Sequence, residues 1–290
     1  MWTLEKSTNI IRSLSGLVNY QGLVIGVSDE YHALFVRGDD GDHLFDFSGH
    51  PLDMEYLERK KVKLDHESIS LQQRNGQDFV FTLPSFSKPN RNQIGVFHIQ
   101  NFQGRLEIKS TRTFSCDVLL HNLSSSCQLN IEGHFQSQGQ MYLLNRGNQS
   151  QGNELIKIQN ADQWILQVLN SDSDKDLVYA ISRFPVELGS FDGYALQWTD
   201  GIYETESTMI FLATVETTLN AYDDGQVLGS FIGRYNYQNN QVVTVKKILD
   251  GKKAEGICMW NSKFLVCLDA DSSEMTSEFY SFPLTILDRV

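Results

Sequence analysis

The fold is decided by one stretch, residues 129–146, which reads LNIEGHFQSQGQMYLLNR. One apolar segment begins at Glu132-Gly133, and a second, Met141-Tyr142-Leu143-Leu144, follows a tight turn and ends at the polar pair Asn145-Arg146. Short apolar segments separated by Gly and Asn turns are typical of antiparallel strands. The stretch therefore predicts a hairpin that starts at an acid-Gly pair and ends in a polar loop.

The acid-Gly start recurs along the chain. Neighbouring copies lie 46 to 65 residues apart, and an apolar strand ends 14 to 16 residues after four of the five copies. The copy at Asp192 reaches its strand end, Glu216, only after 24 residues. A hairpin plus a polar loop repeated at this period indicates propeller blades. Each copy has an acid or amide, then Gly or Ser, then a bulkier residue: Gln21-Gly22-Leu23, Glu67-Ser68-Ile69, Glu132-Gly133-His134, Asp192-Gly193-Tyr194 and Glu255-Gly256-Ile257.

The sequence predicts an all-β fold, a single β-propeller domain over residues 1–290 with about five four-stranded blades. A sixth blade would fit in the long stretches 100–130 or 160–190, and residues 161–170 suit either a short helix or an outer strand. The segment from Asn9 to Leu14 is expected to close the ring by adding an outer strand to the last blade. Closure of this kind removes exposed sheet edges.

Composition limits the partners. The chain of 290 residues is 41% hydrophobic and carries a formal net charge of −12. Such a surface repels nucleic acid and anionic lipid and attracts cations, so we expect no nucleic-acid or membrane partner. The chain does not begin with the basic and then apolar segments that are typical of a signal peptide. Its four cysteines form no CxxC pair. We expect a cytoplasmic monomer with reduced cysteines.

In a propeller, the starts of the innermost strands and the loops after the second strands meet at one end of the central channel. Carboxylate and amide oxygens gathered there suit Ca²⁺, which takes six to eight oxygen ligands. The expected metal ligands are Glu132, Glu255, Asp269 and Asp271. The expected ligand-binding residues are Glu67, Glu132, Asn145, Arg146, Asn148, Asp192, Glu216 and Glu255.

A purely structural role for the acid-Gly pairs is the alternative. The carboxylates would then accept hydrogen bonds from the backbone of the neighbouring blade, and Gly would allow the strands to pack closely.

Several segments together resemble a bacterial family of uncharacterised propellers that is similar to the phytase-like propellers. The resemblance covers most of the chain from about residue 60 onward, while Gln21 departs from the pattern because an acid is expected there. It implies a propeller fold far more than an activity. The segments are Leu129-Asn130-Ile131-Glu132-Gly133, Asn145-Arg146-Gly147-Asn148 with Asn153, Ala213-Thr214-Val215-Glu216, Gly229-Ser230-Phe231-Ile232-Gly233, and Lys253-Ala254-Glu255-Gly256 followed by Asp269-Ala270-Asp271.

Three functions follow from this face, and the sequence leaves open whether the protein is an enzyme. The first is an acidic pocket at the channel mouth that binds a small polar ligand, together with a divalent cation, without catalysis. The second is a metal-dependent hydrolase of a phosphate ester or lactone, in which the ion activates water and Arg146 holds an anionic group. The third is a docking face for a basic protein partner, with Tyr31 and Tyr222 near the rim.

Overall fold

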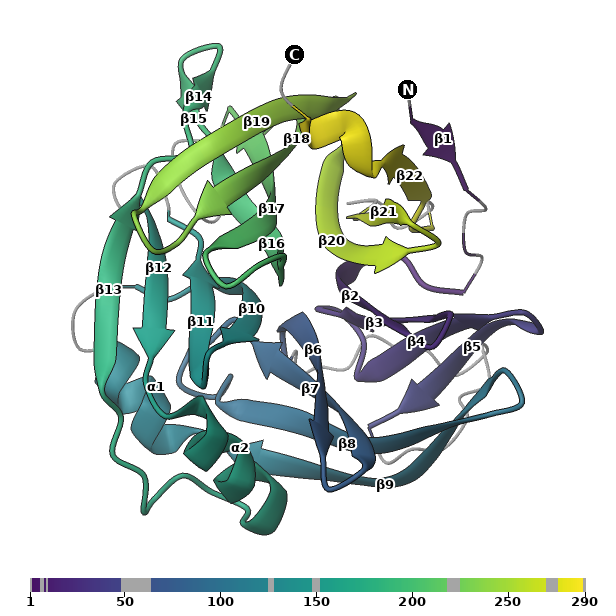
Figure 1. The fold of residues 1–290 in the computed structure, drawn as a ribbon, viewed down its shortest axis with the longest axis vertical. Coiled ribbons are helices and arrows are strands. Elements are labelled where there is room, and N and C mark those ends of the chain that lie inside the picture. The colour runs from purple at the N-terminus through teal and green to yellow at the C-terminus, as the bar shows by residue number, and fades with distance from the viewer. Residues whose placement is uncertain are drawn as a thin grey trace.

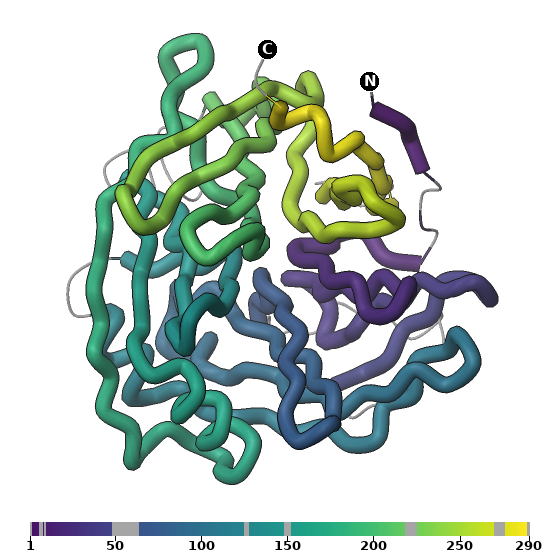
Figure 2. The backbone as a smooth tube through the Cα atoms, viewed as in Figure 1, coloured from purple at the N-terminus to yellow at the C-terminus, as the bar shows by residue number. Residues whose placement is uncertain are grey.

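The computed structural model describes residues 2–5, 8, 10–47, 64–124, 128–147, 152–217, 225–269 and 276–288. Five four-stranded antiparallel sheets stand around a central axis as the blades of a propeller, so the predicted fold and blade number are confirmed (Figure 1). The chain travels round the ring once, and both termini lie beside the last blade (Figure 2).

Each blade is built from strands that follow one another in sequence, from the innermost strand outward. Blade 1 contains β2 (Leu14–Tyr20), β3 (Leu23–Ser28), β4 (Ala33–Gly38) and β5 (Gly41–Asp46). Blade 2 contains β6 (His66–Arg74), β7 (Gln77–Pro84), β8 (Gln93–Phe102) and β9 (Arg105–Ser115). Blade 3 contains β10 (Ile131–Ser137), β11 (Gln140–Asn145), β12 (Asn153–Ile158) and β13 (Ile181–Val186). Blade 4 contains β16 (Gln197–Tyr203), β17 (Thr208–Glu216), β18 (Val227–Asn236) and β19 (Gln241–Asp250). Blade 5 contains β20 (Lys253–Trp260), β21 (Lys263–Asp269), β22 (Phe279–Pro283) and, on its outer edge, β1 (Thr3–Leu4).

The N-terminal segment closes the ring, but with other residues than expected. Thr3 pairs with Ser281 and Leu4 with Tyr280. The prediction that residues from Asn9 to Leu14 form this strand is wrong for Leu14, which begins β2, while Asn9 lies outside the described residues. Ile11 and Leu14 have apolar side chains, and both are buried in the core between blades 5 and 1 instead of lying on an outer edge.

The long stretches that left room for a sixth blade hold other elements. Within the described residues, the first holds the end of β8, β9 and the helix α1 (Asp117–Ser124), and the second holds the helix α2 (Ala161–Asn170) and β13. Both helices pack into one apolar cluster with strands of blades 2 and 3. Of the two alternatives for 161–170, the helix is therefore correct. Among the described residues, no helix is long and apolar enough to cross a membrane.

A β-bulge recurs near the start of the innermost strand of every blade. In every blade one residue is skipped in the pairing with the second strand, and a small or acidic residue follows it. A bulged residue is left out of the ladder and its side chain is re-aimed. The five bulged residues are Ser15, Glu67, Glu132, Thr199 and Glu255.

Two of the five predicted strand starts are therefore wrong. Gln21-Gly22 forms the turn between β2 and β3, and Asp192-Gly193 forms the exposed turn of a small hairpin, β14 (Ser190–Phe191) and β15 (Tyr194–Ala195). Both pairs have positive φ, 52° and 92° for the first and 50° and 85° for the second. A polar residue followed by Gly is also the preferred composition of a two-residue hairpin turn, so the three-residue pattern does not separate the two cases.

Glycine after the bulge allows neighbouring innermost strands to approach closely. A Cβ atom on Gly256 would lie 3.0 Å from the Cα atom of Gly16 in blade 1 and 2.8 Å from Sγ of Cys267. Neither neighbour can move freely, because one is backbone and the other belongs to the buried core.

We predict that Gly256→Ala lowers the free energy of unfolding by about 1–3 kcal/mol, the usual cost of overpacking. The matched control is Gly152→Ala, since a Cβ atom there meets nothing within 4 Å and the residue is exposed. Denaturant unfolding of both variants measures the difference, and equal stabilities would show that the inner strands need no glycine.

Candidate functional site

The bulges bring three glutamates together at the channel. Glu67, Glu132 and Glu255 come from blades 2, 3 and 5, and each offers a carboxylate oxygen within 4.8 Å of the other two. Glu132 and Glu255 are each only 5% exposed. The two remaining blades place the neutral residues Ser15 and Thr199 at the bulge. Three of the four predicted acidic strand starts thus meet, while Asp192 does not join them.

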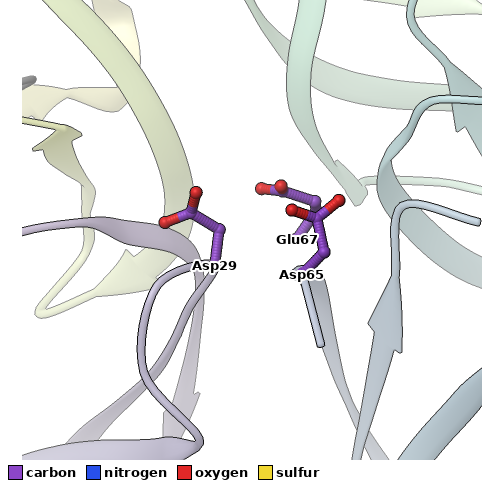
Figure 3. Close-up of side chains that lie close together, drawn as sticks. All are labelled: Asp29, Asp65 and Glu67. Carbon is purple, nitrogen blue, oxygen red and sulfur yellow. The ribbon is translucent and has the colours of Figure 1, made fainter. Parts of the chain in front are cut away.

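A second acidic group extends the site and shares Glu67. Asp29 directly follows β3 and Asp65 directly precedes β6, and their carboxylate oxygens lie within 4.8 Å of each other and of Glu67. In Figure 3, the side chain of Glu67 extends toward Asp29. Asp65 is fixed by an ion pair with Arg91 and accepts a hydrogen bond from the hydroxyl of Ser85. Neither aspartate was identified from the sequence, because each lies just outside its strand and beyond the repeated motif.

Arg146 lies beside the glutamates, as predicted. Its guanidinium is 2.8 Å from Glu216 and 3.5 Å from Glu132, and its Nε donates to Oε1 of Gln197. Arg146 thus forms an ion pair with the bulged glutamate of its own blade. Glu216 lies at the end of β17, so a second strand does deliver a charged residue to this end of the channel.

Lys253 is the other basic residue of the site. Its Nζ lies 2.7 Å from Glu255 and 3.9 Å from Glu216, so Glu216 is shared between Lys253 and Arg146. Lys253 belongs to one of the segments that carry the family resemblance, but its role as a counter-charge was not predicted. The available signal was its position two residues before Glu255 at the start of β20, close enough in sequence for an ion pair.

Burial raises the pKa values of two carboxyl groups in this cluster. Desolvation raises the pKa of Glu132 to about 7, against the opposing charge of Arg146. Desolvation raises the pKa of Glu67 well above its usual value, and the nearby charges of Asp29 and Glu132 add to the effect. Glu67 makes no salt bridge or side-chain hydrogen bond with any residue that the structure describes. Its charge is therefore the least compensated in the cluster.

Asp200 has the structural role that was the alternative for the acid-Gly pairs. Its Oδ2 accepts a hydrogen bond from the backbone N–H of Ile257 at 2.8 Å, and its Oδ1 accepts one from Gly201 at 2.7 Å. The side chain thereby joins blade 4 to blade 5. Sequence reasoning missed Asp200-Gly201, although the pair lies 16 residues before Glu216 and so fits the usual distance that the Asp192 copy failed to meet.

The other predicted residues differ in where they lie. Asn145, at the end of β11, connects two neighbouring segments. Its Oδ1 accepts a hydrogen bond from the backbone N–H of Asn130, and its Nδ2 donates one to Glu154. Asp269 ends β21 opposite Lys253. Asn148 and Asp271 lie outside the described residues, as does Tyr222. Tyr31 is buried in the core, so it supplies no aromatic rim.

Fold and site together define a five-bladed propeller with a buried acidic cluster at its channel. Residues 10–284 match the model of a family of unknown function, DUF6929, and the chain belongs to that family. No curated protein matches it.

Solved structures share the fold at very low identity. A putative oxidoreductase (glucose dehydrogenase) of Thermus thermophilus is 7% identical, with 97% of this chain and 99% of that chain covered and a TM-score of 0.50. The arabinanase Arb43A of Bacillus subtilis is 11% identical, with 96% of each chain covered and a TM-score of 0.49. Glutaminyl cyclase of Myxococcus xanthus is also 11% identical, with 97% of this chain and 95% of that chain covered and a TM-score of 0.44. The likeness to the first of these, at 7% identity, shows the fold alone.

The raised carboxyl pKa values predict how stability depends on pH. The folded protein holds on Glu132 a proton that the unfolded chain releases, so stability falls as the pH rises from about 4.5 to about 7. With a chelator present, we expect the free energy of unfolding to fall by an amount on the order of 3 kcal/mol across this window from Glu132. Denaturant unfolding at a series of pH values measures the slope.

Glu132→Gln should flatten that slope, because the amide does not titrate. Asp192→Asn is the control, since Asp192 is exposed in a hairpin turn that asparagine also accepts. A slope that survives Glu132→Gln unchanged would mean that Glu132 titrates normally in the folded protein.

Proposed function

We propose that the channel mouth binds a divalent cation, with Ca²⁺ as the expected ion, and through it a small polar ligand. The observation that carries the proposal is the approach of the Glu67, Glu132 and Glu255 carboxylate oxygens to within 4.8 Å of one another. Ligand oxygens lie about 2.3–2.6 Å from Ca²⁺, so two ligands on opposite sides of one ion are about 5 Å apart. The spacing in this cluster fits a shared ion.

The charges of the site also favour a divalent ion. When ionised, Glu67, Glu132, Glu255 and Glu216 carry four negative charges, while Arg146 and Lys253 supply two positive ones. One divalent cation would balance the remainder. The bound cation would also lower the raised pKa values of the carboxyl groups, because a nearby positive charge favours their ionised form.

Three protein carboxylates leave coordination positions for oxygen atoms of a bound molecule. Ca²⁺ takes six to eight ligands, so water or a polar ligand would complete the shell. Asp269 at the end of β21 and Asp271 beyond it are proposed to add oxygens from that side. Asn145, Arg146, Asn148 and Glu216 are proposed to contact the polar ligand, whereas the exposed hairpin position of Asp192 removes it from this set.

We predict that millimolar Ca²⁺ at pH 8 raises the melting temperature of the protein by at least about 2 °C relative to chelator. A cation that binds only the folded state stabilises it by about 2.7 kcal/mol at 100 times its Kd, and a chain of this size gains a few degrees from that. Thermal unfolding followed by circular dichroism measures the shift, with Mg²⁺ and Mn²⁺ as comparison ions.

The double variant Glu132→Gln/Glu255→Gln should lose this increase, and Glu67→Gln should weaken it, because Gln keeps the volume and removes the charge. Asp192→Asn should respond to Ca²⁺ as the unaltered protein does. If none of the three ions shifts the melting temperature of the unaltered protein, the acids are structural.

A second function, metal-dependent hydrolysis of a phosphate ester or lactone, is favoured by one observation. Arg146 lies 3.5 Å from Glu132 and 2.8 Å from Glu216, beside the proposed ion. An arginine there can hold the anionic group of a substrate whose hydrolysis the ion would promote by activating water. The resemblance to phytase-like propellers points the same way.

Hydrolysis of 4-nitrophenyl phosphate and of a chromogenic lactone in Ca²⁺ tests this second function. We expect activity that requires Ca²⁺ and falls at least about tenfold in Glu132→Gln, because loss of this carboxylate weakens binding of the ion that activates water. Ca²⁺ binding without turnover of either compound would leave the non-catalytic binding site as the function.

The proposed location is the cytoplasm. Cys116, Cys258 and Cys267 are buried free thiols, which suits a reducing compartment. We also propose that the protein acts as a monomer without a nucleic-acid or membrane partner, because of its net charge of −12. A basic protein partner is the less favoured occupant of the acidic face, because the glutamates are buried rather than spread over a flat rim.

A further inference from the structure

A cavity of about 310 Å³ lies on the flank of the propeller, away from the channel. Its floor is the sheet of blade 2, its wall is α2, and its end is the turn between β6 and β7. Although α2 follows β12 of blade 3 in sequence, it packs against blade 2, where the ring of Trp164 meets that of Phe81 at 5.9 Å (Figure 1). The cavity is thus built by two blades.

The floor carries apolar and polar groups in adjacent rows. Phe79, His98 and Ser110 are cross-strand neighbours on β7, β8 and β9, and the rings of Phe79 and His98 lie 5.1 Å apart. In the next row on the same side of the sheet, Val96 of β8 pairs with Arg112 of β9. Across from them α2 presents Leu166, which is 50% exposed, and Leu169. An aromatic ring would be in contact with apolar side chains on both sides.

Arg112 gives the cavity its chemical character. Its guanidinium makes no salt bridge or hydrogen bond with any residue in the described ranges, and its buried Nη2 has no acceptor. Burial lowers the pKa of Arg112, and the charge of Asp172 only partly opposes this. At the end of the cavity, Arg74 pairs with Asp162 through Nη2, but its buried Nε also lacks an acceptor.

Buried guanidinium donors without acceptors are costly, and in most proteins they are paired. The chain has a net charge of −12, so a cavity lined by two arginines differs in charge from the protein as a whole. An oxyanion that approached Arg112 would supply the missing acceptor, since arginine forms charge-assisted hydrogen bonds with phosphate and carboxylate oxygens.

We propose that this cavity binds a small organic anion, with a phosphate or carboxylate group at Arg112 and an aromatic or similarly flat apolar body between Phe79 and Leu166. The cavity volume is at the small end of the range for ligand sites, which suits a molecule with a single ring. The site is separate from the acidic cluster and independent of the function proposed there.

Phenyl phosphate is the probe, and its binding is measured by titration followed by amide NMR shifts of the intact protein. We expect saturable shifts at β8, β9 and α2, and affinity at least about tenfold weaker in Arg112→Gln. Arg105→Gln is the matched control on the same strand, because Arg105 is exposed and pairs with Asp40 outside the cavity. Benzoate in place of phenyl phosphate shows whether a carboxylate is accepted as the head group.

A second variant tests the apolar half of the site. Leu166→Ser should weaken phenyl phosphate but leave inorganic phosphate unchanged, and its folding is not at risk because Leu166 is half exposed. Arg112→Gln should melt no lower than the unaltered protein, since it removes an unpaired charge. Equal affinity of phenyl phosphate for the unaltered protein and Arg112→Gln, or no binding at all, would overturn the proposal.

Discussion

The repeated β-bulge at the start of each innermost strand is the constraint on which the rest of the structure depends. It takes one residue per blade out of the ladder, and the innermost strands of neighbouring blades contact one another around the whole ring. The bulged residues of blades 2, 3 and 5 are glutamates, and their carboxylates meet where little water reaches Glu132 and Glu255. Repulsion between the three follows from the arrangement of the blades, because each comes from a different blade.

The surrounding residues reduce that repulsion in different ways. Arg146 and Lys253 share Glu216 and so form a chain of opposite charges from Glu132 to Glu255. Asp200 accepts two backbone N–H groups, which offset part of the burial that raises its pKa. Only Glu67 lacks such a partner among the described residues. The cluster thus keeps one poorly compensated carboxylate, whose charge a bound cation would offset.

The sequence was sufficient for the architecture because strand alternation and turn composition repeat in every blade, so errors in single copies average out. It was insufficient at Asp192, where an acid-Gly pair in a hairpin turn has the same letters as one at a bulge. Glu67, Glu132 and Glu255 could be predicted from the repeat. Asp29 and Asp65 could not, because their approach depends on how blade 1 meets blade 2, and the motif contains no information on that angle.

The three glutamates are unevenly distributed around the ring. Glu67 and Glu132 come from neighbouring blades, while Glu255 lies between the blades of the neutral residues Thr199 and Ser15. Three charges on five positions cannot all be separated, and this order leaves only one adjacent pair. Lys253 lies on the strand of the isolated glutamate, and Arg146 is on the blade of Glu132, which leaves Glu67 facing both groups of acids. Glu67 is thus the one carboxylate that both groups share, so an ion bound by the three glutamates would also reduce the repulsion between Glu67 and the two aspartates.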